Sequence, residues 1–422
     1  MRDKARGEAG VSRLLLSCLL GLLLIACGPQ PSEKKPMTQV PKLENLSDKL
    51  AFTCAHEADR MPKPDPELEL LFKHARWLEK RNLLRNDRAK YPPIERLYRI
   101  AAAHGHIKAM NNLIVWILEG KSEADGNIDL VVDMTQDMIK QGIPQGYYIM
   151  GILLENDYGV TAEKGADLQY KRKAADLGSV DAQFTIGTRL ESLGFANPVP
   201  YAVGKQMVRC AADQGHGMAA KSVAHTLHVL AEDGRETAFS TTVLTSAERA
   251  QAYADAVKYH QIAVKAGISQ AAFTLQDAFL CTDPTDRLDY YALEKDEERS
   301  RRYAAISKIL DGYEHLNATV DEIDEIVPLP PAKLPPWDGK IKWVEEWKKG
   351  EPPPLPSEER ITELAIKKNL NPKTGLPVKV DLKTTSLRDP ETGEKIHFDI
   401  ETLKLVGRVL RAMRNAELGG TT

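Results

Sequence analysis

The stretch AADLGSVDAQFTIG, residues 174–187, contains the pattern that decides the fold. Two alanines precede Gly178, the small residue Ala182 follows the glycine after four positions, and the apolar Ile186 follows it after eight. Glycine adopts the left-handed backbone conformation at little cost and therefore commonly ends a helix. A small residue in the next segment allows two helix backbones to approach closely. The stretch therefore predicts the end of one helix, a tight turn, and a second helix packed against the first.

The same pattern occurs five times in this chain of 422 residues. The first four glycines are 36–37 residues apart, and the last interval is about 16 residues longer, which predicts an insertion near 231–250. A larger apolar or aromatic residue stands eight positions before each glycine. A period in the mid-thirties is typical of stacked helix–turn–helix pairs, in which each pair buries its apolar face against its neighbours. The five glycines are Gly105, Gly142, Gly178, Gly215 and Gly267, and the residues eight positions before them are Leu97, Met134, Tyr170, Met207 and Tyr259.

The second unit departs from the pattern, because Met138 and Ile139 replace the alanine pair and Pro144 follows the glycine. Over residues 91–279 the pattern resembles the Sel-one-like repeat, a relative of the tetratricopeptide repeat. The resemblance implies a mainly α fold, a helix–turn–helix repeat solenoid, which we expect to occupy residues 91–316.

Three segments flank the predicted array. Residues 48–90 are expected to form N-terminal capping helices, since the end units of an array need a polar outer face. Residues 317–357 are rich in proline and tryptophan, which excludes a regular helix and favours an extended strip packed on the array. Residues 358–422 are predicted to form a small α+β region, with strands near 378–382 and 395–400 and a final helix over 401–415.

The N-terminus has the features of an export signal. Basic residues precede an apolar run that ends at Leu24-Ile25-Ala26-Cys27, and this run is too short to span a membrane comfortably. The four residues resemble the lipobox of bacterial lipoproteins; the alternative is a cysteine that ends an uncleaved anchor. The resemblance implies that residues 1–26 are a signal peptide and that Cys27 is lipidated. It also implies that residues 27–47 are a flexible tether on the periplasmic side of the envelope, and Gly28 favours the outer membrane.

Three cysteines follow Cys27, so a single disulfide would leave one thiol free. The bacterial periplasm is oxidising and permits a disulfide, but sequence alone does not fix the pair. Cys210 occupies a strong helical repeat position typical of a small core residue. We therefore predict a disulfide between Cys54 and Cys281.

No catalytic or cofactor motif is present. His104 and His106 straddle a repeat turn, and His225 and His228 lie three apart on a helix, but neither pair has the second ligand pair that structural zinc requires. The net charge of −3 and the lack of a basic stripe argue against nucleic acid. We therefore predict no enzyme activity, no metal, no cofactor and no small-molecule substrate. A helical array presents an extended surface, so the expected partner is a protein, at a binding face that the sequence does not identify.

Several features together narrow that partner. The lipobox, the segment FTCAHEAD (Phe52–Asp59), the segment LYRIAAAHGHIKAMNNL (Leu97–Leu113) and the proline–tryptophan strip resemble a group of periplasmic Sel-one-like lipoproteins. Some members are encoded beside antibacterial phospholipase effectors of the type VI secretion system and neutralise them. The resemblance implies an immunity protein that binds a secreted phospholipase toxin. The alternatives are an envelope scaffold or adaptor lipoprotein and, in a different class, an envelope enzyme with a spatially assembled site.

Overall fold

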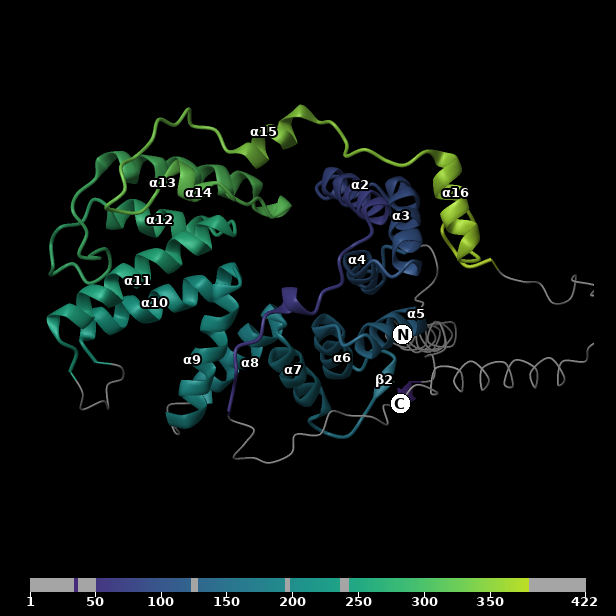
Figure 1. Ribbon diagram of the computed structural model, residues 1–422, viewed down its shortest axis with the longest axis horizontal. Helices are drawn as coiled ribbons and strands as arrows, with labels where there is room; N and C mark the ends of the chain where they lie inside the picture. Colours follow the sequence, from purple (N-terminus) through teal and green to yellow (C-terminus); the bar gives the residue numbers. More distant parts are fainter. Residues whose placement is uncertain (1–33, 37–50, 123–127, 194–197, 236–242, 379–422) are drawn as a thin grey trace, which may run out of the picture.

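The computed structural model describes residues 34–36, 51–122, 128–193, 198–235 and 243–378 (Figure 1). These residues are predominantly helical, which confirms the mainly α fold class. The repeat helices are α3 (Tyr91–Ala103), α4 (Ile107–Leu118), α5 (Ile128–Lys140), α6 (Pro144–Glu155), α7 (Ala166–Leu177), α8 (Val180–Leu193), α9 (Pro198–Asp213), α10 (Gly217–Asp233), α11 (Ser246–Lys265) and α12 (Ser269–Ala278). The flanking helices are η2 (Glu57–Asp59), α2 (Pro66–Asn82), η3 (Arg88–Lys90), α13 (Glu297–Tyr313), η4 (Glu314–Leu316), α14 (Ile323–Ile326), α15 (Lys342–Lys349) and α16 (Glu358–Lys367).

The five glycines of the sequence pattern lie in the turns that join the two helices of each pair. All five have positive φ, between 71° and 109°. In the third pair the Gly178 N–H donates to the Ala175 carbonyl and the Ser179 N–H donates to the Ala174 carbonyl. The same two bonds recur in the other four turns, where they satisfy carbonyls that the end of a helix leaves without partners.

Gly267 shows why one of these positions tolerates no side chain. Its φ is +94°, and a Cβ atom there would lie 2.0 Å from the Ala318 carbonyl oxygen. The close approach exists because the chain after α13 crosses the turn, where the Val320 N–H donates to the Lys265 carbonyl. The last repeat is therefore locked directly to the segment that follows it.

The second repeat forms despite its unusual sequence. Met138 and Ile139 provide the same two carbonyl acceptors as the alanine pairs. Pro144 is the first residue of α6, where a missing N–H costs nothing because no helical acceptor faces it. Gly146 replaces the usual alanine because a Cβ there would lie 2.6 Å from the Met138 Cβ.

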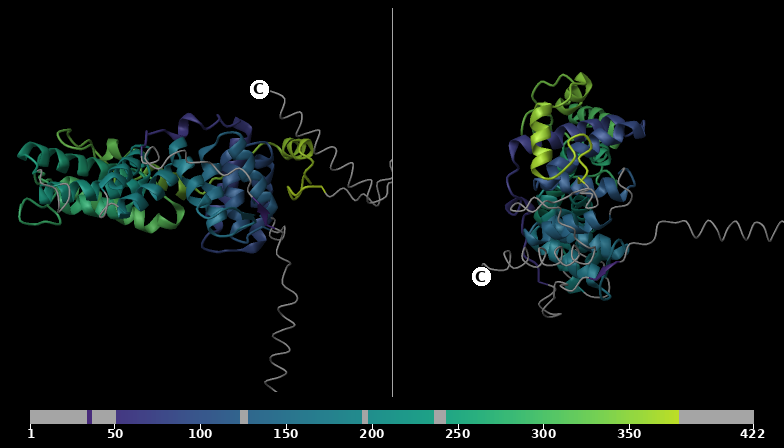
Figure 2. Two further views of the ribbon diagram at one scale, coloured as in Figure 1. Left: turned by 90° about the horizontal axis from the view of Figure 1, so that it is seen from below. Right: turned by 90° about the vertical axis from the view of Figure 1, so that its right-hand side faces the viewer.

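The helices form an arc (Figure 1). Two large apolar cores lie between the packed helices along it. The first core joins α2 to α7 and includes Leu71, Ile100 and Met150. The second runs from α9 to α15 and includes Tyr303 and Phe279. Among the described residues, two small clusters on α7, α8 and α9 lie between the two cores along the chain. Figure 2 shows the same arc edge-on, where it is flat.

The segment after α13 spans the opening of the arc and closes it into a ring (Figure 1). Ile341 and Val344 are buried in the second core, whereas Ile361 and Leu364 of α16 are buried in the first. Arg360 binds Glu67 of α2 through two bonds of 2.8 and 2.9 Å, and the His104 Nε2 atom lies 2.9 Å from the Leu364 carbonyl oxygen. The chain thus connects the last repeat back to the first.

Three expectations from the sequence need correction. Residues 51–61 form an extended strap with one short turn, η2, so within residues 48–90 α2 alone is a long capping helix. Lys35–Pro36 (β1), in the expected flexible tether, pairs in parallel with Val160–Thr161 (β2), and Lys35 forms ion pairs with Asp129 and Asp133. The strip 317–357 also contains a real helix, α15, because KWVEEWKK lies between prolines but contains none.

The predicted lipobox, Cys27, and the predicted strands and helix after residue 378 lie outside the described residues. Within the described ranges, no helix has both the length and the apolar character needed to cross a membrane.

Candidate partner-binding site

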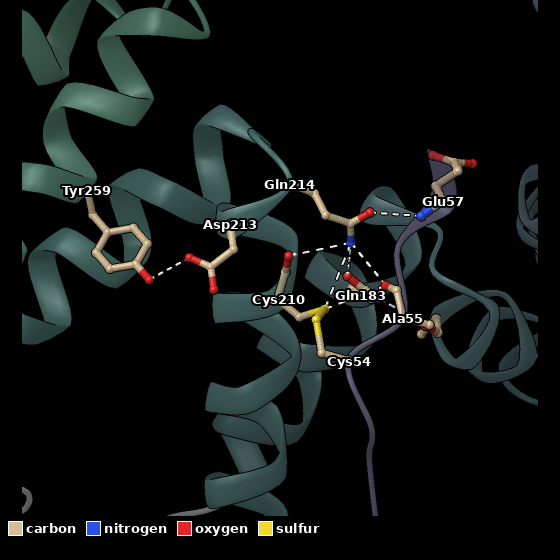
Figure 3. Close-up of a disulfide and its surroundings, with 9 residues drawn as sticks. Cys54, Ala55, Glu57, Gln183, Cys210, Asp213, Gln214 and Tyr259 are labelled. Carbon is tan, nitrogen blue, oxygen red and sulfur yellow. Dashed lines mark hydrogen bonds between the residues drawn. A yellow bond between two sulfur atoms is a disulfide. The ribbon is translucent and has the colours of Figure 1, made fainter. Parts of the chain in front are cut away.

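The strap, residues 51–61, runs from the middle of the array into the interior of the ring (Figures 1 and 3). A disulfide joins Cys54 to Cys210 near the end of α9, with a Cα–Cα distance of 5.7 Å. Phe52 packs on the small apolar cluster beneath α8 and α9. The strap therefore reinforces the part of the array where the apolar core is thinnest.

Two glutamines hold the strap backbone in place (Figure 3). Gln214 accepts a bond from the Glu57 N–H at 2.8 Å and donates to the Gln183 amide oxygen at 2.8 Å. Gln183 donates to the Ala55 carbonyl at 2.9 Å and to the Ala175 carbonyl at 3.1 Å. The turn at Gly178 packs against His56 so closely that a Cβ there would lie 2.6 Å from the His56 carbonyl carbon. Strap and repeat turns thus form one fixed surface.

This surface lines an open pocket of about 610 Å³, which we call the inner pocket. The strap contributes one wall, and the N-terminal turns of the second helices contribute the other. The lining residues are His56, Glu57, Ala58, Met61, Ile107, Lys108, Asn111, Gln145, Val180, Asp181 and Gln214. Seven of these eleven residues have polar or charged side chains, and the remaining lining is apolar, so the pocket can offer a partner both hydrogen bonds and apolar contacts.

Glu57 is the most perturbed titratable group of the inner pocket. Its burial, together with the negative charge of Asp181, raises its pKa to about 7, against a weaker opposing bond from the Val180 backbone. His216 lies beside Asp181, with 3.7 Å between Nε2 and Oδ1, and burial lowers its pKa. The charge of this wall therefore changes near neutral pH.

Glu69 of α2 connects the inner pocket to the outer side of α2. Its carboxylate lies 2.9 Å from the His106 Nε2 atom, 3.7 Å from the Lys108 Nζ atom and 3.6 Å from the Lys73 Nζ atom. Burial raises the pKa of Glu69, but the His106 bond and the two lysine charges outweigh burial and lower it. Lys108 lines the inner pocket and Lys73 lines a second pocket on the other side of α2. Glu69 therefore links the two pockets across α2.

The predicted disulfide between Cys54 and Cys281 is wrong. Cys54 pairs with Cys210, and Cys281 is a free, partly exposed thiol. Cys210 does occupy a buried repeat position, as its spacing predicts, but the strap passes directly over that position. A contact between segments 156 residues apart produces no local sequence pattern from which it could be predicted.

The structure also shows where the candidate metal ligands lie. His106 begins α4 by accepting the Ala109 N–H at its Nδ1 atom, and His228 contacts the Tyr290 carbonyl at 3.0 Å. In the described part of the chain, ligand atoms of Cys54, His56 and Cys210 lie within 4.8 Å of one another. Two of these three sulfur and nitrogen ligands are already bonded in the disulfide, so the group offers one free donor.

Sequence reasoning missed Glu57, Gln183 and Gln214. Gln214 directly precedes the repeat glycine Gly215. Gln183 directly follows Ala182, the small residue of the repeat that contains Gly178. Both glutamines therefore occupy fixed repeat positions. The amide of Gln183 is a usable signal, because the corresponding residues of the other repeats, Met110, Tyr147, Ala220 and Ala272, carry no amide, whereas Gln214 shares its residue type with Gln141 of the second repeat. Asp213 is held in the same turn, where it accepts a 2.6 Å bond from the Tyr259 hydroxyl (Figure 3).

The chain is similar in fold to several solved structures. The Pseudomonas aeruginosa protein PA5086 is 25% identical over 66% of this chain and 95% of its own, with a TM-score of 0.46. The P. aeruginosa immunity protein Pa5087 is 23% identical over 67% of this chain and 95% of its own, with a TM-score of 0.45. A Sel1 repeat protein from Oxalobacter formigenes is 20% identical over 52% of this chain and 85% of its own, with a TM-score of 0.33.

Sequence comparisons add one match. No curated protein matches this chain. Residues 271–378 match the family model described as a domain of unknown function, DUF6396. That span runs from α12 through the strip to the last described residue, so it contains the whole segment that closes the ring.

Proposed function

We propose that this protein is a membrane-anchored, periplasmic immunity protein that binds and neutralises an antibacterial phospholipase effector of the type VI secretion system. The observation that carries the proposal is the inner pocket, a fixed polar surface formed jointly by the strap and four repeats. Rigid helical arrays with such surfaces bind proteins more often than they catalyse reactions.

The partner's identity rests on the sequence resemblance carried by the lipobox, the FTCAHEAD segment, the first repeat and the proline–tryptophan strip. Two of the similar solved proteins, Pa5087 and PA5088 of P. aeruginosa, are immunity proteins. Lipidation at Cys27 would keep the ring at the membrane where a phospholipase acts. A stable complex of ordinary size would bury roughly 1,600 Å² in total, which exceeds the inner pocket and requires neighbouring surface.

The test is bacterial survival on co-expression. The product of the neighbouring gene is directed to the periplasm of a sensitive host, with and without this protein, and its phospholipase activity is assayed in parallel. Rescue by the wild-type chain is the expected result, and a Cys27→Ala form with an ordinary cleavable signal measures what the anchor contributes. Equal killing with and without the protein would contradict the proposal.

A matched pair of variants tests the inner pocket itself. Asn111→Arg places a long cationic side chain in the pocket and is expected to abolish rescue. Gln251→Arg makes the same change at an exposed position of α11 and is expected to leave rescue intact. Loss of rescue in both variants, or in neither, would remove the inner pocket from the proposal.

A further inference from the structure

A second pocket lies where the strip meets α2, at the closure of the ring. It has a volume of about 590 Å³ and is open to solvent. Four aromatic side chains line it: Phe72, Trp77, Trp343 and Trp347. We call it the aromatic groove. Trp343 and Trp347 lie one turn apart on α15 and stack with their rings inclined by 11°. All four aromatic side chains are partly exposed. A cluster of exposed aromatic side chains is unfavourable in water and commonly marks an interaction site.

The groove contains cations that form no ion pair in the part of the chain that the structure describes. Four cationic and two acidic side chains line it, the acids being the exposed Glu346 and Glu351. Arg76 pairs with Glu79 at 2.6 Å and Lys73 with Glu69. Lys80 and Lys349 have no acidic partner within salt-bridge distance in the described ranges.

Lys80 occupies an unusual position for a lysine. Its Nζ atom lies 5.3 Å from the centre of the Trp343 ring. Burial and the nearby charge of Arg76 lower its pKa. Next to it, Arg81 lies 3.8 Å from the centre of the Trp347 ring and donates to the Trp347 carbonyl. Two adjacent cations thus rest on aromatic faces. The carboxylate that acts on Lys80, Glu79, is already paired with Arg76, which leaves Lys80 able to recruit a further anion.

We propose that the aromatic groove is a second docking surface for the protein partner and that it takes an acidic segment with apolar side chains. The carboxylates would lie against Lys80 and Lys349, and the apolar side chains would pack on the tryptophans. Tryptophan and arginine are the residue types most enriched where protein interfaces gain their binding energy. The identity of the partner rests on the proposed function, but the chemistry of the groove does not.

The groove also extends the inner pocket. Glu69 contacts Lys73 of the groove and Lys108 of the inner pocket, so one partner can cover both across α2. Together they provide the larger surface that a stable complex needs. Because the groove is built from α2 and α15, it exists only while the ring is closed.

The test measures binding of a short labelled peptide, in which glutamates alternate with leucines, to the purified full-length protein. Matched peptides carry serine or lysine in place of glutamate, and vesicles containing phosphatidylglycerol form a separate arm. We expect the glutamate peptide alone to bind, with weaker binding at high salt. Lys349→Glu changes an exposed residue and is expected to weaken binding about ten-fold or more. Lys80→Glu is expected to do the same, after circular dichroism has shown that the variant is folded.

Lys258→Glu, at an exposed position of α11, is the matched control and is expected to bind like the wild type. Equal binding of the serine peptide, an equal effect of Lys258→Glu, or binding of vesicles but not of peptide would overturn the proposal. The peptide assay needs no phospholipase, so its failure beside a successful survival assay would refute the groove alone. Peptide binding without survival rescue would refute the proposed function and leave the groove standing.

Discussion

The disulfide provides the most quantitative prediction. Cys54 and Cys210 are 156 residues apart, and closing a loop of that length removes about 5 kcal/mol of denatured-state entropy at 25 °C in the chain-entropy model. Measured values for natural disulfides are usually about 2–5 kcal/mol. We expect Cys54→Ser to lower the free energy of unfolding within that range, because Cys54 is exposed and serine fits there without a buried hydroxyl. For a chain of this size the melting temperature should fall by about 3–7 °C.

The assay is thermal unfolding of the purified chain, monitored by circular dichroism, with and without a reducing agent. Cys281→Ser is the control, and it is expected to melt like the wild type because Cys281 is free. Reduction should lower the melting temperature of the wild type and Cys281→Ser but not that of Cys54→Ser. Non-reducing peptide mapping should recover a peptide pair containing Cys54 and Cys210. If Cys281→Ser were destabilised and Cys54→Ser were not, the placement of the strap would be refuted.

Three further predictions concern the turns, the inner pocket and the ring closure. Gly267→Ala should destabilise the protein by several kcal/mol more than Gly105→Ala. Both substitutions force alanine into positive φ, at a cost of about 1–2 kcal/mol, but only the Cβ at Gly267 collides with the Ala318 carbonyl oxygen, since a Cβ at Gly105 meets nothing within 4 Å. Equal melting temperatures of the two variants would contradict this. The pKa of Glu57 is raised to about 7 in the native state, so the native state holds the Glu57 proton more tightly than the unfolded state does. The free energy of unfolding is therefore highest below pH 4.5 with respect to this group, and it falls as the pH rises from about 4.5 to 7. Glu57→Gln should therefore stabilise the protein relative to wild type at pH 8 but not at pH 4.5, whereas Asp59→Asn should show no such difference in chemical unfolding. Trp347→Ala should speed proteolytic cleavage in the strip without changing the helical content, and unchanged cleavage would show that the tryptophan contacts do not hold the ring closed.

The repeat pattern in the sequence predicted the fold well because each repeat is a local unit. Gly178, Ala182 and Tyr170 act within a single helix pair or between neighbouring pairs, so their spacing directly records their packing. The irregular second repeat also adopts the helix–turn–helix fold, since a proline at the first position of a helix, as at Pro144, breaks no hydrogen bond of that helix.

The sequence could not predict what crosses between distant parts of the chain. The strap pairs Cys54 with Cys210, and the strip brings Trp347 to Arg81, across separations that no local pattern records. Both candidate binding surfaces depend on these crossings, which is why the sequence predicted a binding protein but no binding face. The prolines on either side of α15 predicted an extended strip, although the short segment between them is amphipathic and contains no proline.

The central claim is that the ring binds a phospholipase directly through the inner pocket. The most direct measurement is a calorimetric titration of the purified chain, wild type and Asn111→Arg, with the purified product of the neighbouring gene, after that product has been shown to be a phospholipase. We predict a one-to-one complex with a dissociation constant in the nanomolar range, about −12 kcal/mol, loss of lipase activity on binding, and at least a hundred-fold weaker binding for Asn111→Arg. Absence of binding by the wild type at micromolar concentration, or equal binding by both forms, would contradict the claim.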